Sequence, residues 1–328
     1  MGDIGLYYGD ELLQYSFPNG HKFNKMRVKS FWEAIQIFGL LERREIKLLK
    51  PVLASVEILE LFHTRDYIEF VKKMSEIGSG MLDYGDTPAF KGVFEAASYV
   101  VGSVVDAVDR VMSGELGHCF IPVAGLHHAR RDRAAGFCVF NDIGVAIIYA
   151  KKKYNLNRIL YVDIDAHHGD GVFYEFYDDP TVYIADIHED GRYLYPGTGL
   201  REETGSPQAP NTKLNIPLPP GSTDKEFLEA FKEVEEFARR VKPELIFFQC
   251  GADGLEGDPI THLRYTYRAH RHAAETLHEI AHSFCKGRLV ATGGGGYDEN
   301  NTAAAWSAVL MAFLGPRWDM PTSPGHML

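Results

Sequence analysis

The sequence predicts an α/β fold in which a central, mostly parallel sheet is flanked by helices. Two observations predict it: short apolar runs alternate with amphipathic helical patterns, and four of these runs end in polar or glycine-rich sequence. A third observation concerns domain organisation. The 328 residues contain no linker-like or low-complexity stretch and no repeat of fixed period, so we expect one domain spanning residues 1–328.

The predicted elements follow from the spacing of apolar residues. Unbroken apolar runs of strand length predict strands at 119–123, 159–162, 182–187, 245–249 and 289–291. Apolar residues three and four positions apart predict helices at 91–112, 142–153, 224–241, 264–285 and 301–314. The segments GLHHA, DAHHGD, GADG and TGGGGY follow four of the predicted strands. Ligands of open α/β sheets bind beyond the carboxyl ends of strands, so we expect the chemistry at that edge.

Composition limits the functional classes. A formal net charge of −11 disfavours direct nucleic-acid binding, and the basic stretch 264–272 is interpreted as a solvated helix face. The four cysteines are scattered and none forms a CxxC pair, which predicts reduced thiols in a cytoplasmic protein. We expect no membrane helix, because no apolar stretch is long enough, and no export signal. Association into a homo-oligomer is left open.

The segment DIDAHHGDG, residues 163–171, carries the strongest chemical signal. It follows a buried apolar run, so its charges need neutralisation, most simply by a divalent cation. Asp165 and His167 lie two positions apart and can face the same side, and Asp253 follows another predicted strand. These three ligands leave one position open, as catalytic Zn²⁺ requires, and Fe²⁺ or Co²⁺ would also suit them. The alternative is a structural role in which Asp165 and His167 cap a helix.

Two further motifs supply groups for proton transfer. His127 and His128 follow a predicted strand as an adjacent pair, and Asp163 and Asp170 are carboxylates that can fix the imidazole tautomers. Tyr297 follows four consecutive glycines, so its phenol can approach a metal and stabilise a developing oxyanion. The glycines could instead cradle a phosphate, but they lack the lysine of a P-loop and the spacing of a dinucleotide fingerprint.

The ordered motifs GLHHA, GFC, DIDAHHGDG, YPGTG, QCGADGLEGDP and GGGGY resemble the histone deacetylase family, and the match covers nearly the whole chain. The stretch HEDGRYLYPGTG is most similar to the prokaryotic acetoin-utilization (AcuC-type) branch of that family. The resemblance implies the three-layer arginase/deacetylase fold. It also implies a metal-dependent amidohydrolase that converts Nε-acetyl-lysine in proteins to lysine and acetate.

The resemblance assigns roles to matching residues. It implies Zn²⁺ on Asp165, His167 and Asp253, with His128 as general base and acid and Tyr297 polarising the acetyl carbonyl. The remaining catalytic residues are His127, Asp163 and Asp170. The implied substrate-binding residues are Asp86, Gly136, Phe137, Tyr195 and Ile260, and Arg27 and Gly125 would line an acetate exit. A K⁺ site would involve Asp163, Asp165, His167, Asp186 and Ile187.

Departures from related patterns separate the alternatives. Arginase-like binuclear hydrolases need carboxylates where this chain has Gly169 and Leu255, so we expect one transition-metal site here. Some acetylpolyamine hydrolases have a glutamate where Ile260 stands, which favours acetyl-lysine but leaves acetylpolyamines and other small acetyl-amides as alternatives. A non-catalytic, metal-stabilised binding module would lack a histidine or the tyrosine, and neither is missing. Asp186 replaces the serine usual at the K⁺ site and is expected to strengthen that site or change its ion.

Overall fold

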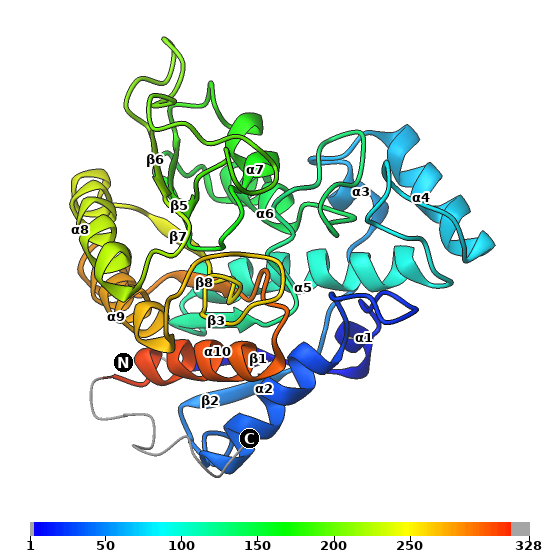
Figure 1. Ribbon diagram of the computed structural model, residues 1–328, viewed down its shortest axis with the longest axis horizontal. Coiled ribbons are helices and arrows are strands. Elements are labelled where there is room, and N and C mark those ends of the chain that lie inside the picture. Colours follow the sequence, from blue (N-terminus) through cyan, green and yellow to red (C-terminus); the bar gives the residue numbers. More distant parts are fainter. Residues whose placement is uncertain (1–2, 316–328) are drawn as a thin grey trace.

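One eight-stranded sheet organises residues 3–315, the part of the chain that the computed structural model describes (Figure 1). The strand order is β2-β1-β3-β8-β7-β4-β5-β6, and all neighbouring strands are parallel. The strands are β1 (Ile4–Tyr7), β2 (Ile46–Leu49), β3 (His118–Ile121), β4 (Ile159–Asp163), β5 (Val182–Glu189), β6 (Lys213–Leu218), β7 (Leu245–Gln249) and β8 (Leu289–Thr292). The predicted α/β class with a central parallel sheet is confirmed.

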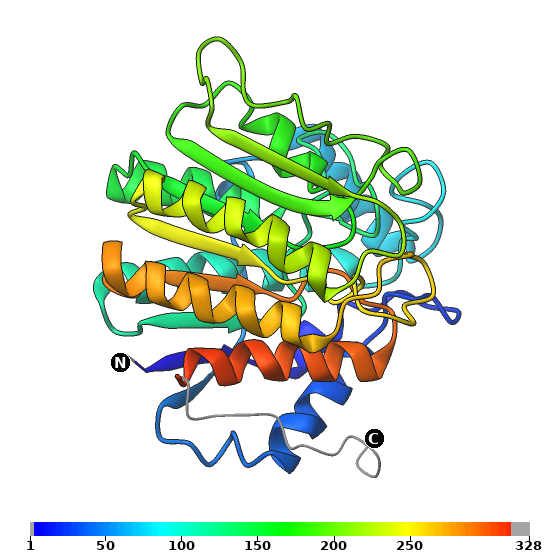
Figure 2. The ribbon, with the colours of Figure 1, turned by 60° about the vertical axis from the view of Figure 1, so that its left-hand side comes forward.

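Helices cover both faces of the sheet, giving three layers (Figures 1 and 2). One face carries α2 (Met26–Ile37), α8 (Asp224–Val241), α9 (Tyr267–Phe284) and α10 (Glu299–Phe313). The other carries α5 (Val93–Ser113) and α6 (Asp142–Tyr154), with α1 (Asp10–Leu13), α3 (Val56–Leu59), α4 (Arg65–Ile77) and α7 (Asp170–Glu175) around them. No helix within residues 3–315 is long and apolar enough to cross a membrane.

The sequence explains these elements locally. Strands β4 and β7 are buried along their whole length, as expected of central strands covered on both faces. Helix α8 matches the predicted range 224–241, because Thr223 and Glu226 form a capping box at its start. Asp298 caps α10 by accepting hydrogen bonds from the backbone N–H groups of Asn300 and Asn301.

Several predicted boundaries are corrected. The strand predicted at 119–123 ends at Ile121, since Pro122 has no N–H to donate to a neighbouring strand. The helix predicted at 264–285 begins at Tyr267, because Thr266 caps it and the two residues before Thr266 form isolated bridges. Strands β1, β2 and β6 were not predicted. Residues 1–2 and 316–328 of the expected domain lie outside the described part of the chain.

The sheet register places the chemical motifs together. Asp163 at the end of β4 pairs with Asp186 on β5 and with Gln249 on β7. Gln249 in turn pairs with Thr292 at the end of β8. The loops after β4, β7 and β8 carry DAHHGD, GADG and GGGGY, so these motifs meet at the carboxyl edge, as predicted.

Candidate metal centre and active site

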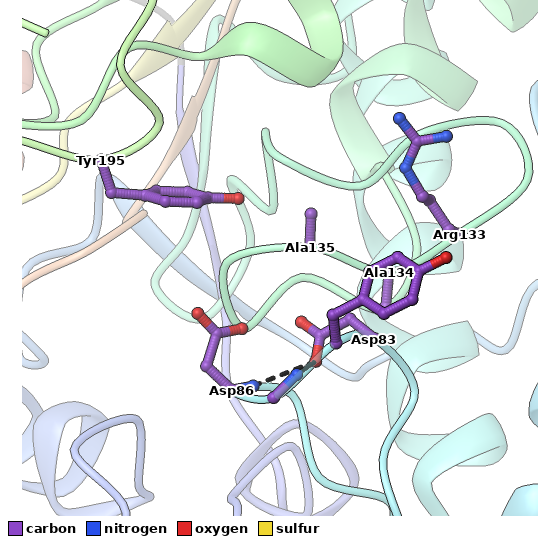
Figure 3. Close-up of a pocket in the computed structure, with 8 residues that line it drawn as sticks. Asp83, Asp86, Arg133, Ala134, Ala135 and Tyr195 are labelled. Carbon is purple, nitrogen blue, oxygen red and sulfur yellow. Dashed lines mark hydrogen bonds between the residues drawn. The ribbon is translucent and has the colours of Figure 1, made fainter.

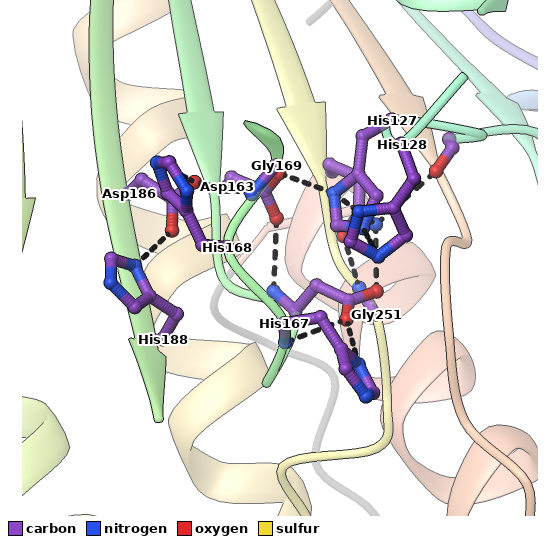
Figure 4. Close-up of polar contacts among 12 residues, drawn as sticks. His127, His128, Asp163, His167, His168, Gly169, Asp186, His188 and Gly251 are labelled. Carbon is purple, nitrogen blue, oxygen red and sulfur yellow. Dashed lines mark hydrogen bonds and ion pairs between the residues drawn. The ribbon is translucent and has the colours of Figure 1, made fainter. Parts of the chain in front are cut away.

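Three buried side chains form a candidate metal site at this edge. Asp165 and His167 lie on the loop after β4, and Asp253 lies on the loop after the adjacent strand β7. His167 Nδ1 is 2.9 Å from Asp253 Oδ2 and 3.1 Å from Asp165 Oδ1. Ligand atoms from all three residues lie within 4.8 Å of one another. The structure therefore brings together the three residues predicted as metal ligands (His167 in Figure 4).

Hydrogen bonds fix both carboxylates. Asp165 Oδ2 accepts hydrogen bonds from Gln249 Nε2 at 2.8 Å and from the backbone N–H of Gly295 at 2.7 Å. Asp253 Oδ1 accepts a hydrogen bond from the backbone N–H of Ala166 at 2.8 Å. These donors orient the carboxylates before any ion binds, as expected of a site with ordered outer contacts.

Glycines make room for these carboxylates. A Cβ at Gly251 would collide with Asp165 Oδ2, and a Cβ at Gly295 would collide with Asp253 Oδ2. The glycines in GADG and GGGGY are thus required by close approach of the backbone to the acidic oxygens, which is one of the uses of glycine in proteins.

The electrostatics of the cluster fit a divalent cation. Burial and the nearby Asp165 carboxylate raise the pKa of Asp253 to about 7. Burial opposes ionisation of Asp165 as well, but His127 and His167 outweigh it and hold the pKa of Asp165 well below its usual value. Two carboxylates this close repel each other when both are ionised. Two such oxygens and one imidazole match a divalent charge and the donor set of a catalytic metal.

The two adjacent histidines form a polarised pair (Figure 4). His127 Nδ1 donates to Asp163 Oδ2, and His128 Nδ1 donates to Asp170 Oδ1, each at 2.7 Å. The two Nε2 atoms are 3.1 Å apart. Both Nδ1 atoms carry a proton that points at a carboxylate. A hydrogen bond between the two Nε2 atoms then requires that one of them carries a proton and the other does not. The two rings therefore differ in protonation.

The surroundings decide which ring is charged. Burial disfavours a charged His127, but Asp163 and Asp165 outweigh it and raise the pKa of His127 to about 10. Burial and the positive charge of His127 lower the pKa of His128 to about 4. At neutral pH, His128 is the uncharged ring and the one able to accept a proton.

Other residues support the carboxylates of this pair, and sequence reasoning did not identify them. Arg130 donates to Asp170 Oδ2 at 2.5 Å and to the Asp170 carbonyl at 3.0 Å. The Tyr161 hydroxyl donates to Asp163 Oδ2, and the Asp165 N–H donates to Asp163 Oδ1 at 3.0 Å. Tyr161 lies two residues before Asp163 on β4, so the alternation of side chains along the strand could have indicated this contact.

Tyr297 lies beside the cluster at the end of the glycine run. Its backbone N–H donates to Asp258 Oδ2 at 2.8 Å, and its ring lies edge-on to Phe137 with centroids 5.7 Å apart. Burial raises the pKa of Tyr297 well above its usual value, so the phenol keeps its proton and can act as a donor. Gly296 has a φ of 119°, which allows the turn that precedes this ring.

The predicted acetate-exit residues lie against the same glycine run. Arg27 is fully buried and donates to the carbonyls of Gly294 and Gly296, both at 2.5 Å. Its Nη1 atom is buried and has no hydrogen-bond partner among residues 3–315. Gly125 packs so tightly on Gly294 that a Cβ would lie 2.9 Å from the Gly294 nitrogen.

Two of the predicted substrate residues border a surface hollow of about 380 Å³ near the histidine pair. Figure 3 shows Tyr195 across this hollow from Asp86. The Tyr195 ring lies edge-on to His128, with centroids 5.1 Å apart. Gly136 separates them, since a Cβ there would lie 2.5 Å from His128 Cδ2 and 3.1 Å from Tyr195 Cε1. Tyr195 therefore lies both on the rim of the hollow and beside the candidate base.

Phe137 and Ile260, the other predicted substrate residues, lie on loops around the site. Phe137 adopts a φ of 66° and is held by Tyr15, whose hydroxyl donates to its carbonyl at 2.7 Å. Ile260 is partly exposed, and its N–H donates to Asp258 Oδ1 at 3.0 Å. Asp258 thus links the loop of Ile260 to the backbone of Tyr297.

Asp186 is buried and has several partners. Its Oδ2 accepts from the N–H of Gly169 at 2.9 Å, and its Oδ1 is 2.7 Å from His188 Nδ1 (Figure 4). Burial opposes protonation of His188, but Asp186 outweighs it and raises the pKa of His188. Asp186 pairs with Asp163 across strands β4 and β5. The negative charge of Asp186 is balanced in part by the neighbouring His188.

One expectation about the basic stretch 264–272 is wrong for part of it. His270 is fully buried, and its Nε2 donates to the carbonyl of Gly251 at 2.7 Å, beneath the loop that carries Asp253. Arg264 does lie on the surface, where it pairs with Glu256. The helical period of α9 places His270 on the same buried face as Ala273, Ala274 and Leu277, and this pattern could have predicted its burial.

Comparison with known proteins gives one family. Residues 21–313 match the model of the histone deacetylase domain. The chain is 41% identical to the acetoin utilization protein AcuC of Bacillus subtilis (strain 168), covering 99% of this chain and 84% of the relative. It is 36% identical to AcuC of Staphylococcus xylosus, covering 95% and 82%. The crystal structure of the HDA15 HD domain superimposes with a TM-score of 0.87 at 24% identity, covering 95% of this chain and 88% of that one.

Proposed function

Since the chain belongs to the histone deacetylase family and is an AcuC-like deacetylase, we propose that it hydrolyses Nε-acetyl-lysine in proteins to lysine and acetate. The observation that carries the proposal is the neutral His128, fixed by Asp170 and set beside both His127 and the three-ligand cluster. A base, an ion site and a phenol donor at one strand edge are the groups that amide hydrolysis needs.

Asp165, His167 and Asp253 are the proposed ligands of a divalent cation, for which Zn²⁺ is our first choice and Fe²⁺ or Co²⁺ the alternatives. When bound, such an ion polarises a carbonyl oxygen and makes water a better nucleophile at neutral pH. The mutual repulsion of the two buried carboxylates supports the assignment, because a cation relieves it.

The protein groups divide the proton transfers between them. As the new C–O bond forms, His128 Nε2 gives up its hydrogen bond from His127 and takes the proton of the attacking water, and Asp170 stabilises the resulting imidazolium. The positive His127 and the Tyr297 hydroxyl stabilise the oxyanion. His128 then passes its proton to the leaving amine as the C–N bond breaks, which releases lysine and acetate. Arg27, with one unpartnered nitrogen, is proposed to attract the acetate anion.

The proposed substrate path runs from this hollow past Tyr195 towards His128. Phe137 and Tyr195 would flank the apolar part of the acyl-lysine chain, and Asp86 would accept hydrogen bonds from the substrate backbone. Ile260 offers no charge to a second amine, which favours acetyl-lysine over acetylpolyamines.

A comparison of substrates tests this function. Acetate release is measured from an acetyl-lysine peptide, acetyl-spermidine and a small acetyl-amide, with the protein as purified, after chelation, and after Zn²⁺ is restored. We expect the peptide to have the highest kcat/KM, and chelation to abolish activity until metal returns. Preference for acetyl-spermidine would favour the polyamine alternative, and turnover by fully metal-free protein would refute the scheme.

We propose K⁺ near Asp163, Asp165, His167, Asp186 and Ile187, to be tested by anomalous scattering from Rb⁺ or Tl⁺ in crystals. A cytoplasmic location is supported by four free, buried cysteines and is tested by cell fractionation. A single catalytic domain spanning 1–328 is supported by the common sheet, and limited proteolysis would test it.

A further inference from the structure

A second cluster of metal-binding side chains lies far from the edge that holds the catalytic motifs. Within residues 3–315, His118, His278 and His282 form a group whose ligand atoms all lie within 4.8 Å of one another. His118 is the first residue of β3, at the amino end of the strand. His278 and His282 lie one turn apart near the end of α9, the orange helix across the front of the sheet in Figure 2. None of the three takes part in the proposed reaction.

The buried member of this histidine cluster is oriented by the backbone. His118 is 2% exposed, and its Nδ1 lies 2.7 Å from the carbonyl oxygen of Gly287. A carbonyl only accepts, so Nδ1 carries the proton and Nε2 presents its lone pair. Histidines that bind metals commonly donate their other N–H to a backbone carbonyl in this way. His118 is therefore fixed in the tautomer that a metal ligand needs.

The lone pair of His118 points at the other histidines. His118 Nε2 is 2.8 Å from His278 Nδ1, and the rings of His278 and His282 have centroids 4.5 Å apart. Gly287 leaves room for the His282 ring, because a Cβ atom at Gly287 would lie only 2.9 Å from His282 Cε1. Metal–nitrogen bonds of about 2.0–2.1 Å place the nitrogens of a tetrahedral site roughly 3.3 Å apart. The 2.8 Å pair must therefore open slightly, and any pair near the 4.8 Å limit must close. His282 is exposed and free to make that adjustment.

The donors of this cluster are three imidazoles. The nearest carboxylate on the rim, Glu279, is paired with Arg239 at 3.0 Å, so imidazole nitrogens dominate the donor set.

We propose that His118, His278 and His282 bind a divalent first-row transition-metal ion, such as Zn²⁺, at a second site. Three imidazoles favour Zn²⁺, Cu²⁺, Ni²⁺ or Co²⁺ over Mg²⁺ or Ca²⁺. The fourth position faces an open hollow of about 470 Å³ at His278 and His282, so water completes the coordination. The ion fastens the end of α9 to the start of β3 and thereby stabilises the packing of that helix on the sheet.

Metal stoichiometry tests the second site in the full-length protein. Metal-free protein is titrated with Zn²⁺ against a chromophoric chelator, using wild type, His282→Ala and the matched control His272→Ala on the same helix. We expect two equivalents bound by wild type and by the control, and one by His282→Ala. Deacetylase activity should be unchanged in both variants, because neither residue belongs to the candidate active site.

Two readouts separate the second site from the catalytic one. In Asp165→Asn, which weakens the catalytic site, added Zn²⁺ should still raise the melting temperature by several degrees, and the further change His282→Ala should remove that rise. Copper-loaded Asp165→Asn should show nitrogen hyperfine coupling in its electron paramagnetic resonance spectrum, and the further change His282→Ala should reduce that coupling, although His167 is still present. Equal stoichiometry in wild type and His282→Ala, or no Zn²⁺-dependent rise in Asp165→Asn, would overturn the proposal whether or not the protein is a deacetylase.

Discussion

At the residue scale, each reactive side chain depends on a neighbour that sets its charge. His128 is neutral because burial and the positive His127 beside it lower its pKa, and His127 is positive because Asp163 and Asp165 outweigh the cost of burial. Tyr297 keeps its proton because it is buried near acidic groups. Two histidines with the same intrinsic pKa thus have different pKa values because their surroundings differ. Active sites commonly use such differences to hold a base and an acid side by side.

Replacing Tyr297 by phenylalanine removes one donor to the oxyanion while keeping the ring that packs on Phe137. We expect kcat to fall by roughly 10² or more with little change in stability, since that is the scale for loss of one such donor. Steady-state kinetics on an acetyl-lysine peptide and thermal unfolding measure the two effects. Near-native turnover in the variant would exclude this role for Tyr297.

Asp86 provides a pH-dependent test of substrate binding at the rim. Burial and the neighbouring Asp83 raise the pKa of Asp86 to about 6. Below that pH the carboxylate is protonated and accepts hydrogen bonds poorly, so KM for an acetyl-lysine peptide should rise several-fold between pH 7 and pH 5. The rise should be absent in Asp86→Asn and for a small acetyl-amide that lacks a peptide backbone. An identical pH dependence of KM in wild type and Asp86→Asn would contradict the assignment.

At the element scale, glycines in the loops after β7 and β8 determine whether the metal ligands can approach one another. We expect Gly295→Ala to weaken binding at the catalytic site by 10-fold or more, because the new Cβ meets the carboxylates of Asp253 and Asp165. Its φ lies outside the left-handed region, so the change itself adds no backbone strain. Chelator competition measures affinity, and circular dichroism checks folding.

A loop glycine elsewhere gives the control for Gly295→Ala. Gly20 has a φ of 73° with nothing near its Cβ position, and asparagine tolerates that conformation, so Gly20→Asn should bind metal normally. Wild-type metal affinity in Gly295→Ala would show that the loop shifts without cost and that close approach is not required.

The sequence predicted elements well where a local signal was complete. The helix 224–241 was predicted to the residue because its capping box and apolar period coincide. Strand β1 was missed because its four residues, IGLY, lie between polar segments, and only its neighbours β2 and β3 make it a buried strand. Helix α4 was missed although Thr64 and Gly78 cap its two ends, so that signal was present but not used.

The residues of the candidate site also differ in how far the sequence predicts them. Asp165, His167 and Asp253 were predicted as a cluster because charged residues that follow buried parallel strands lie at the same edge of the sheet. Gln249, Arg130 and His270 were not predicted as parts of the site. Their contacts cross between elements far apart in the chain, and one sequence carries no periodicity that reports such pairs.

At the scale of the whole molecule, the buried carboxylates of the metal site lower the free energy of unfolding of the metal-free protein. Asp253 is fully buried, and its pKa rises from 3.8 to about 7 on folding. Between these pH values the folded state binds more protons than the unfolded state, so the contribution of Asp253 to stability falls as pH rises through the window. The loss is complete above pH 7 and has an upper bound of about 4 kcal/mol. Bound metal offsets this loss, by about 2.7 kcal/mol at an ion concentration 100 times the Kd.

Asp253→Asn separates the two effects, because asparagine cannot ionise yet keeps an oxygen for the N–H of Ala166. In excess chelator at pH 8, we expect the variant to have a higher free energy of unfolding than wild type, with the difference shrinking towards pH 4. With Zn²⁺ added, the order should reverse, since only wild type retains all three ligands of the catalytic site. Chemical denaturation across this pH range, with and without Zn²⁺, measures both. If metal-free Asp253→Asn were less stable than wild type at pH 8, the buried charge would not be the cost of this site, and Asp253 would instead stabilise the metal-free fold through its contact with His167.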